Sequence, residues 1–183
     1  MKEDYSDEEL LKQFENEGTR PKAFNLLVIK YQKRLYWHIR KMVLNHDDAD
    51  DILQNVWIKI WNGLSKFRSD AGLYTWMYRI ASNECLTFLN KKKKKLLVPL
   101  ADMENLLSQS LEADSYFSGD EIQLKLQKAV LSLPEKQRIV FNLRYYDEMK
   151  YEEMSGLLLT SVGALKASYH HAAKKIEKFI SGD

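Results

Sequence analysis

The apolar residues of this chain recur every three or four positions along almost its whole length. The pattern is clearest in the segment 47–61, where apolar side chains follow steps of 1, 3, 1, 3 and 1: Ile52, Leu53, Val56, Trp57, Ile60 and Trp61. Such steps place side chains on one face of an α-helix, so this face is predicted to lie in the core. Seven glycines and three prolines are few, and no alternating strand pattern recurs. The sequence therefore predicts an all-α protein.

Start and stop signals divide this pattern into eight helices. They are predicted near residues 6–17, 21–43, 47–61, 74–94, 120–132, 134–145, 151–158 and 161–179. Ser6 followed by Glu9 is typical of a capping box, and Pro134 is expected at a first helical position. Residues 96–119 break the periodicity with Pro99, Gly119 and scattered serines and acids. We predict two small helical domains, 1–95 and 120–183, joined by a flexible linker over 96–119.

The charge is uneven although the net charge is only +2. Residues 1–17 carry a net charge of −5, whereas residues 91–95 carry +5 and residues 166–178 carry +3. Two separate cationic regions indicate a nucleic-acid-binding protein with two contact regions. The single cysteine, Cys85, is predicted to be buried in a protein of a reducing compartment. Neither a signal peptide nor a membrane span is predicted.

The segment 74–95 combines aromatic rings with a run of five lysines. Its rings, on Tyr74, Trp76, Tyr78 and Phe88, are of the kind on which unpaired bases stack. Ser82 and Asn83 could contact base edges, and Arg68, Arg79 and the lysines could contact phosphates. Packing in the core remains the stronger expectation for any single ring. Rings and lysines together favour a surface for single-stranded nucleic acid.

The segment 151–179 has a helix-turn-helix pattern. Leu159–Ser161 is predicted to form the turn, and Ser161 is a good N-cap for the second helix. Lys166, His170 and Lys174 follow one another at steps of four on its polar face. A second helix of this kind enters the major groove of DNA, although an ordinary helical hairpin remains the alternative. The adjacent His170 and His171 make a poor metal pair, so no metal site is predicted.

Three sequence blocks, in this order, resemble extracytoplasmic-function (ECF) sigma factors of bacterial RNA polymerase. The first is "DADDILQNVWIKIW", which is similar to the region 2 helix that docks on the polymerase clamp. The second, "KFRSDAGLYTWMYRIASNECLTFLNKKKKK", resembles the following loop and promoter-melting helix. The third, "LPEKQRIVFNLRYYDEMKYEEMSGLLLTSVGALKASYHHAAKKI", is similar to region 4. The resemblance covers nearly the whole chain and implies a cytoplasmic, non-enzymatic alternative sigma factor without a cofactor.

The resemblance also implies three sets of site residues. Contacts with the β′ clamp helices of core polymerase would come from Asp51, Gln54, Asn55 and Ile58. Contacts with the −10 element would come from Phe67, Arg68, Ser69, Trp76, Arg79 and Asn83. Contacts with the −35 element would come from Ser161, Gly163, Lys166, Ser168, His170, His171 and Lys174. The implied partners are core polymerase (β′ clamp and β flap), promoter DNA and a membrane-anchored anti-sigma factor, with no small-molecule substrate.

The chain departs from the family pattern at five positions. Ser168, His171 and Ala173 stand where arginine is frequent, Leu159 where glycine is frequent, and Lys150 where a serine or threonine cap is usual. We therefore expect an altered −35 preference and a weaker phosphate grip in the last helix.

Three other functions are weighed against the sigma-factor interpretation. A plain helix-turn-helix regulator would explain residues 120–183 but neither the polar face of 47–61 nor the aromatic segment. An enzyme acting on nucleic acid would need converging acids or a positioned base and nucleophile, and neither they nor a Walker-type glycine loop is evident. A helical adaptor predicts no DNA binding.

Overall fold

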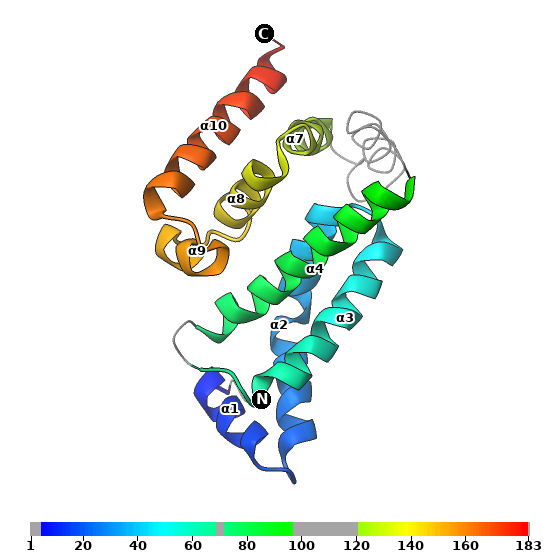
Figure 1. The fold of residues 1–183 in the computed structure, drawn as a ribbon, viewed down its shortest axis with the longest axis vertical. Coiled ribbons are helices and arrows are strands. Elements are labelled where there is room, and N and C mark those ends of the chain that lie inside the picture. The colour runs from blue at the N-terminus through cyan, green and yellow to red at the C-terminus, as the bar shows by residue number, and fades with distance from the viewer. Residues whose placement is uncertain (1–4, 69–71, 97–120, 183) are drawn as a thin grey trace.

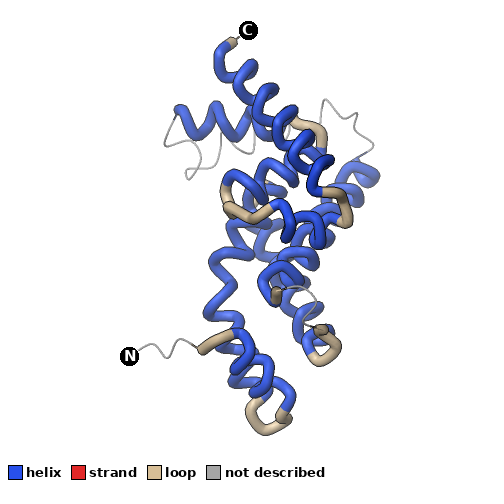
Figure 2. Tube along the Cα trace, turned by 90° about the vertical axis from the view of Figure 1, so that its left-hand side faces the viewer, coloured by secondary structure: helices blue, strands red, loops and turns tan. Residues whose placement is uncertain are grey.

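The computed structural model describes residues 5–68, 72–96 and 121–182, and every regular element in these ranges is a helix (Figures 1 and 2). The helices are α1 (Asp7–Glu15), α2 (Arg20–Val43), α3 (His46–Leu64), α4 (Leu73–Leu96), α7 (Glu121–Leu131), α8 (Glu135–Tyr145), α9 (Tyr151–Leu158) and α10 (Val162–Ser181). The all-α prediction is confirmed. The predicted linker, residues 96–119, lies outside the described residues except for Leu96.

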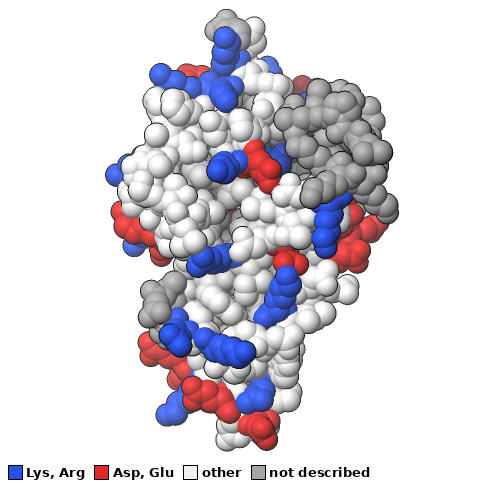
Figure 3. All heavy atoms as spheres, in the orientation of Figure 1, with Lys and Arg blue, Asp and Glu red and all other residues white. Residues whose placement is uncertain are grey.

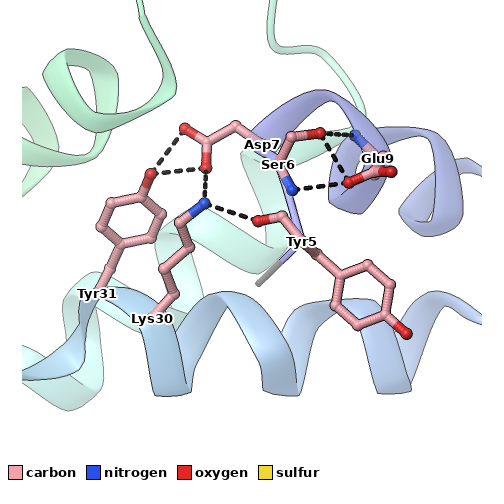
Figure 4. A network of polar contacts seen from close by, with 6 residues as sticks. All are labelled: Tyr5, Ser6, Asp7, Glu9, Lys30 and Tyr31. Atoms are coloured by element: carbon pink, nitrogen blue, oxygen red, sulfur yellow. Dashed lines mark hydrogen bonds and ion pairs between the residues drawn. The ribbon is translucent and has the colours of Figure 1, made fainter. Parts of the chain in front are cut away.

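The acidic helix α1 is fixed to α2 by both polar and apolar contacts. The Ser6 hydroxyl accepts from the Glu9 backbone N–H and the Glu9 carboxylate accepts from the Ser6 N–H, so the predicted capping box is confirmed. The Asp7 carboxylate accepts from the Lys30 ammonium at 2.8 Å and from the Tyr31 hydroxyl at 2.6 Å (Figure 4). Burial, together with the bond to Asp7, raises the pKa of Tyr31 above its usual range. Leu10 and Phe14 are buried beneath these contacts.

Helices α2, α3 and α4 pack against one another around a shared apolar core. Residues four apart on α3, namely Ile52, Val56 and Ile60, are all buried, as the periodicity predicts. Cys85 on α4 is also buried, and burial raises the pKa of its thiol, which leaves it unreactive.

Two helix ends differ from the prediction for local reasons. Helix α3 was predicted to end near Trp61 but continues through Asn62 and Gly63 to Leu64. Pro134 is the N-cap of α8 rather than its first helical residue, because its ψ of 142° is extended. Its carbonyl nevertheless accepts the first helical bond, from the Arg138 N–H at 2.9 Å.

Helices α7, α8, α9 and α10 form the C-terminal group. A core cluster of their own joins Ala129, Val130, Leu133, Phe141, Ala172 and Ile176. Phe141 of α8 and Tyr169 of α10 stack on each other, with a distance of 5.8 Å between the ring centroids. This cluster orients α10 along the outside of the group (Figure 1).

The two helical groups lie in direct contact, which the sequence did not indicate. Helix α9 packs against α4, and α8 contacts α2 (Figure 1). Met154 and Leu157 of α9 belong to the same core cluster as Met77 and Tyr78 of α4. The core of the N-terminal group therefore continues into the C-terminal group.

Candidate functional site

The predicted polymerase-binding residues share one exposed face of α3. Asp51, Gln54, Asn55 and Ile58 are all exposed, and 59% of the Ile58 surface is accessible. The opposite face of the helix is held by the core, so the four side chains sit on a rigid support. The Asn55 amide donates to the backbone carbonyl of Asp51 at 3.0 Å, which orients one of them. We call this set the α3 face.

The α3 face continues one turn further than the sequence indicates. Trp61 was predicted to be in the core stripe, and this prediction is wrong, because 38% of its surface is accessible. Its ring lies edge-on to Phe14 and Phe24, at centroid distances of 5.3 and 4.9 Å. Helix α1 and the start of α2 thus cover one side of the indole and leave the other side open.

Polar side chains at the start and along one side of α3 cap the helix and join it to α4. The Asn45 side chain accepts from the Asp48 N–H at 2.9 Å and caps the helix. The Asp48 carboxylate accepts from the Lys92 ammonium at 2.6 Å, and Lys59 pairs with Glu84. These pairs join α3 to α4. One lysine of the cationic run is therefore engaged within the protein, while Lys91 is exposed and the side chains of residues 93–95 lie outside the description.

The predicted −10 residues differ in accessibility. Arg68 and Asn83 are exposed, Phe67, Trp76 and Arg79 are half-buried, and Ser69 lies outside the described residues. Arg79 and Asn83 are four positions apart and so share a face of α4. The loop that precedes α4 in the second sequence block includes residues 69–71, which lie outside the described residues.

Trp76 has a packing partner on each side. Its ring centroid is 5.2 Å from that of Phe67, and a Cβ added at Gly63 would approach its Cζ2 atom to 3.0 Å. Glycine at position 63 thus leaves room for the indole against α3. This close contact holds the ring at the surface beside the segment that precedes α4.

Two other residues of α4 that the sequence offered to DNA lie in the core instead. Tyr78 is fully buried, and its hydroxyl donates to the Arg34 carbonyl at 3.0 Å. Burial raises the pKa of Tyr78 above its usual range, so the hydroxyl stays protonated. Ser82 is 2% accessible and lies 2.9 Å from His38 Nε2. Burial of Tyr78 agrees with the stronger expectation that a single ring of this segment packs in the core, whereas the expectation that Ser82 contacts base edges is wrong, because its side chain is buried.

The predicted −35 residues lie on and around the N-terminal part of α10. The Ser161 hydroxyl accepts from the Ala164 N–H at 3.3 Å, which confirms its role as N-cap. Gly163, Lys166, His170, His171 and Lys174 are exposed, and Ser168 is half-buried. Lys166, His170 and Lys174 share one face, as predicted. On the side of the molecule in Figure 3, basic and acidic side chains are both spread over the two groups, and several acidic ones lie at the end where α1 is.

The turn before α10 contains Leu159 in a left-handed conformation, with φ 50° and ψ 43°. An L-residue with a Cβ pays a steric cost there that glycine avoids, and 76% of the Leu159 surface is accessible. We expect Leu159→Gly to raise the free energy of unfolding by about 0.5–1 kcal/mol in urea denaturation. Leu159→Ala keeps the Cβ and should give no such gain; an equal gain from alanine would show that backbone strain is not the cause.

Helix α9 begins without a side-chain cap. Lys150 is its N-cap residue, and only its backbone N–H is engaged, by the Glu153 carboxylate at 3.2 Å. The family's serine or threonine would add the missing acceptor. Among the described residues, no three His, Cys, Asp or Glu side chains are grouped so that they could hold a metal ion.

Two parts of the chain match models of known families. Sigma-70 region 2 matches residues 27–95, and Sigma-70, region 4 matches residues 123–176, together about two thirds of the chain. The first match contains the α3 face and α4, and the second contains the helix-turn-helix.

Curated relatives match across most of their length. The ECF RNA polymerase sigma-E factor of Escherichia coli K12 is 28% identical over 169 residues, covering 87% of each chain. The RNA polymerase sigma-H factor of Pseudomonas aeruginosa is also 28% identical over 169 residues, which cover 87% of this chain and 86% of that one.

Two solved structures share the fold. The sigma factor RpoE from Bartonella quintana, in complex with the anti-sigma factor NepR, superimposes with a TM-score of 0.68 at 18% identity, over 88% of this chain and 99% of that one. CnrH in complex with the cytosolic domain of CnrY gives a TM-score of 0.70 at 21% identity, over 95% of this chain and 96% of that one.

With both sigma-70 regions in order and relatives along most of its length, the chain belongs to the ECF sigma factors. It is an alternative sigma factor that directs transcription initiation. No helix in the described ranges is long and apolar enough to cross a membrane.

Proposed function

We propose that this sigma factor binds core RNA polymerase through the α3 face and positions two DNA-binding surfaces, on α4 and α10, over a promoter. The observation that carries the proposal is the exposure of Ile58 among Asp51, Gln54 and Asn55 on a helix whose other side is buried. Covering an exposed aliphatic side chain removes its apolar surface from water, which lowers the free energy of the complex. The polar neighbours supply the orientation, with the β′ clamp helices as the proposed partner.

At the −10 element we assign the contacts to Arg68, Trp76, Arg79 and Asn83, with Phe67 and Ser69 completing the set. Arg79 and Asn83 share a face of α4, so one can contact a phosphate while the other contacts a base edge. The partly accessible Trp76 is the aromatic candidate for an unstacked base. Lys91 at the far end of α4 supplies a further phosphate contact.

At the −35 element the proposed contacts come from the N-terminal half of α10. Ser161 and Gly163 open the helix, where free backbone N–H groups favour a phosphate. Lys166, Ser168, His170, His171 and Lys174 follow along the helix. Because Gly163 has no neighbouring atom within 4 Å of a Cβ position, the start of α10 is free to approach the groove.

The proposed setting is the bacterial cytoplasm, where core polymerase and promoter DNA are found. We further propose that the protein has no catalytic centre and takes no small-molecule substrate; a metal-dependent DNA-cleavage assay would test this. Of the two structural relatives, RpoE is bound to the anti-sigma factor NepR, and CnrH is bound to the cytosolic domain of CnrY. By extension, a membrane-anchored anti-sigma factor is the proposed regulator, and the β flap is the second polymerase contact.

The test of polymerase binding uses purified core enzyme and size-exclusion chromatography. The wild-type protein should form a stable complex that Gln54→Ala/Asn55→Ala weakens. The matched control is Asn25→Ala/Gln32→Ala, which makes the same chemical change at two exposed positions of α2 and should bind like wild type. A folded wild-type protein that forms no complex would contradict the proposal and leave a plain duplex-binding regulator as the explanation for α10.

The lysines of α10 should affect the salt dependence of promoter binding. Each phosphate contact contributes about 0.9 to the slope of log K against log salt. We expect Lys166→Gln/Lys174→Gln to reduce this slope by about 2 in a titration of holoenzyme binding to promoter DNA. Lys12→Gln/Lys22→Gln, at exposed positions of α1 and α2, is the control and should leave the slope unchanged. An unchanged slope in the α10 variant would place the −35 contacts elsewhere.

A further inference from the structure

Leu159, in the turn between α9 and α10, combines an unfavourable backbone conformation with an exposed side chain. Its φ of 50° is in the left-handed region, and 76% of its surface is accessible. Leu44, at the end of α2, has the same side chain in the same backbone region, with φ 64°, but it is completely buried. Apolar burial offsets the steric cost at Leu44. At Leu159 the exposed side chain gives no such compensation.

The core of the protein does not include the Leu159 side chain. Met154, Leu157 and Leu158 of α9 all belong to the main core cluster or pack against it, and Leu159 does neither. The cluster of the C-terminal group does not contain it either. Residues in sparsely populated backbone regions are concentrated at binding sites. Leu159 is therefore a candidate for contact with a binding partner of the protein.

Leu159 lies beside the end of α10 that is assigned to the −35 element. It precedes Ser161, the N-cap of α10, by two residues, so their Cα atoms are at most about 7 Å apart. The N-terminal part of a recognition helix is the part that contacts base edges in the major groove. A DNA strand held at the first turn of α10 therefore passes within reach of the Leu159 side chain.

The other side chains of the turn have hydrogen bonds within the chain. The Thr160 hydroxyl donates to the Leu158 carbonyl at 3.0 Å, and the Ser161 hydroxyl accepts from the Ala164 N–H at 3.3 Å. Leu159 offers only an aliphatic group. In the major groove the matching apolar group is the C5-methyl of thymine, because the other bases are distinguished there by hydrogen-bond donors and acceptors.

The composition of α10 favours a contribution from apolar contacts. Ser168 and His171 stand at positions where arginine is frequent in the family. Arginine forms paired hydrogen bonds with guanine in the major groove, and neither serine nor histidine reproduces them. Fewer charged contacts to base edges leave more of the discrimination between sequences to other side chains near the groove.

We propose that Leu159 determines part of the −35 specificity by contacting the methyl group of a thymine. The proposal rests on the proposed function, because it takes α10 as the −35 recognition helix. The contact removes apolar surface of both the leucine and the methyl group from water. Burial of one such carbon group corresponds to about 0.8 kcal/mol, which is roughly a fourfold change in Kd.

The test compares thymine with uracil, which lacks only the C5-methyl group. Holoenzyme assembled from the purified protein and core polymerase would select promoters from a randomised pool of duplex DNA. Each thymine of the selected −35 element would then be replaced by deoxyuridine. In wild type, one replacement should raise the Kd about fourfold. Leu159→Asn should bind both DNAs equally, because asparagine tolerates the left-handed conformation and is similar in size but lacks the aliphatic end.

Ile122→Asn is the matched control for this substitution. Ile122 lies on α7 and is 78% accessible, so the same chemical change is made at nearly the same exposure. This variant should keep the fourfold preference for thymine. Thermal unfolding would be measured for both variants, and Leu159→Asn should be at least as stable as wild type.

The outcomes separate the thymine contact from the underlying function. Equal binding of thymine and uracil DNA by wild type at every position, or a selected element without thymine, would overturn the contact alone. A fourfold preference that persists in Leu159→Asn would assign the methyl contact to another residue and also overturn the proposal. Failure of the folded protein and core polymerase to select any promoter would overturn the proposed function, and the role of Leu159 with it.

Discussion

Ile58→Glu is expected to raise the Kd for core RNA polymerase by at least about tenfold while leaving the fold intact. The side chain is 59% accessible, so a charge is tolerated in the free protein. Surface substitutions of this kind change stability by no more than about 0.5 kcal/mol. In the complex, the same carboxylate would be buried without a partner, and a buried apolar residue at the centre of an interface commonly contributes 1–2 kcal/mol or more.

The structure offers two matched controls for this substitution. Ile29 on α2 is 56% accessible, so Ile29→Glu makes the same change at the same exposure and should bind polymerase normally. Ile60 is only two positions from Ile58 but is buried, so Ile60→Glu should unfold the protein. Thermal unfolding and complex formation would be measured for all three. Equal loss of binding in the Ile29 and Ile58 variants would remove the case for the α3 face.

Tyr78→Ala is expected to lower the free energy of unfolding by about 3–5 kcal/mol, as measured by urea denaturation. The ring is fully buried, and its centroid lies 4.2 Å from that of the Tyr74 ring and 4.6 Å from that of the His38 ring. Truncation therefore opens a cavity that the neighbouring side chains cannot fill. Tyr78→Phe keeps the ring and loses the hydroxyl that donates to the Arg34 carbonyl. Its cost should be about 1 kcal/mol.

This pair of variants also decides between two roles for the ring. If Tyr78 stacked on bases, Tyr78→Ala would keep its stability and lose promoter opening. Because the ring is in the core, stability should fall first, and any loss of opening should follow from unfolding. Trp76→Ala provides the contrast: its ring is only partly covered, so a smaller loss of stability and a larger defect in opening are expected.

The sequence by itself determined the helices and the faces of α3 and α10. The apolar spacing that places Ile52, Val56 and Ile60 inside leaves Asp51, Asn55 and Ile58 outside, whatever the helix packs against. The cap at Ser161 and the turn at Leu159 are likewise local, because neighbouring residues along the chain supply their hydrogen bonds and dihedral angles. One apolar side per helix is enough to predict most of these positions, and Trp61, which was predicted in the stripe of α3 but is 38% accessible, is the exception.

Only the tertiary structure decided which residues of α4 are buried and how the two helical groups contact each other. Helix α4 is contacted by α2, α3 and α9, so no single apolar stripe distinguishes its inside from its outside, and Tyr78 and Ser82 are buried although both carry hydroxyl groups. His38 meets Ser82 from 44 positions away and Asp147 from 109 positions away. No periodicity along the chain encodes such a meeting, because it depends on how completed helices pack in three dimensions.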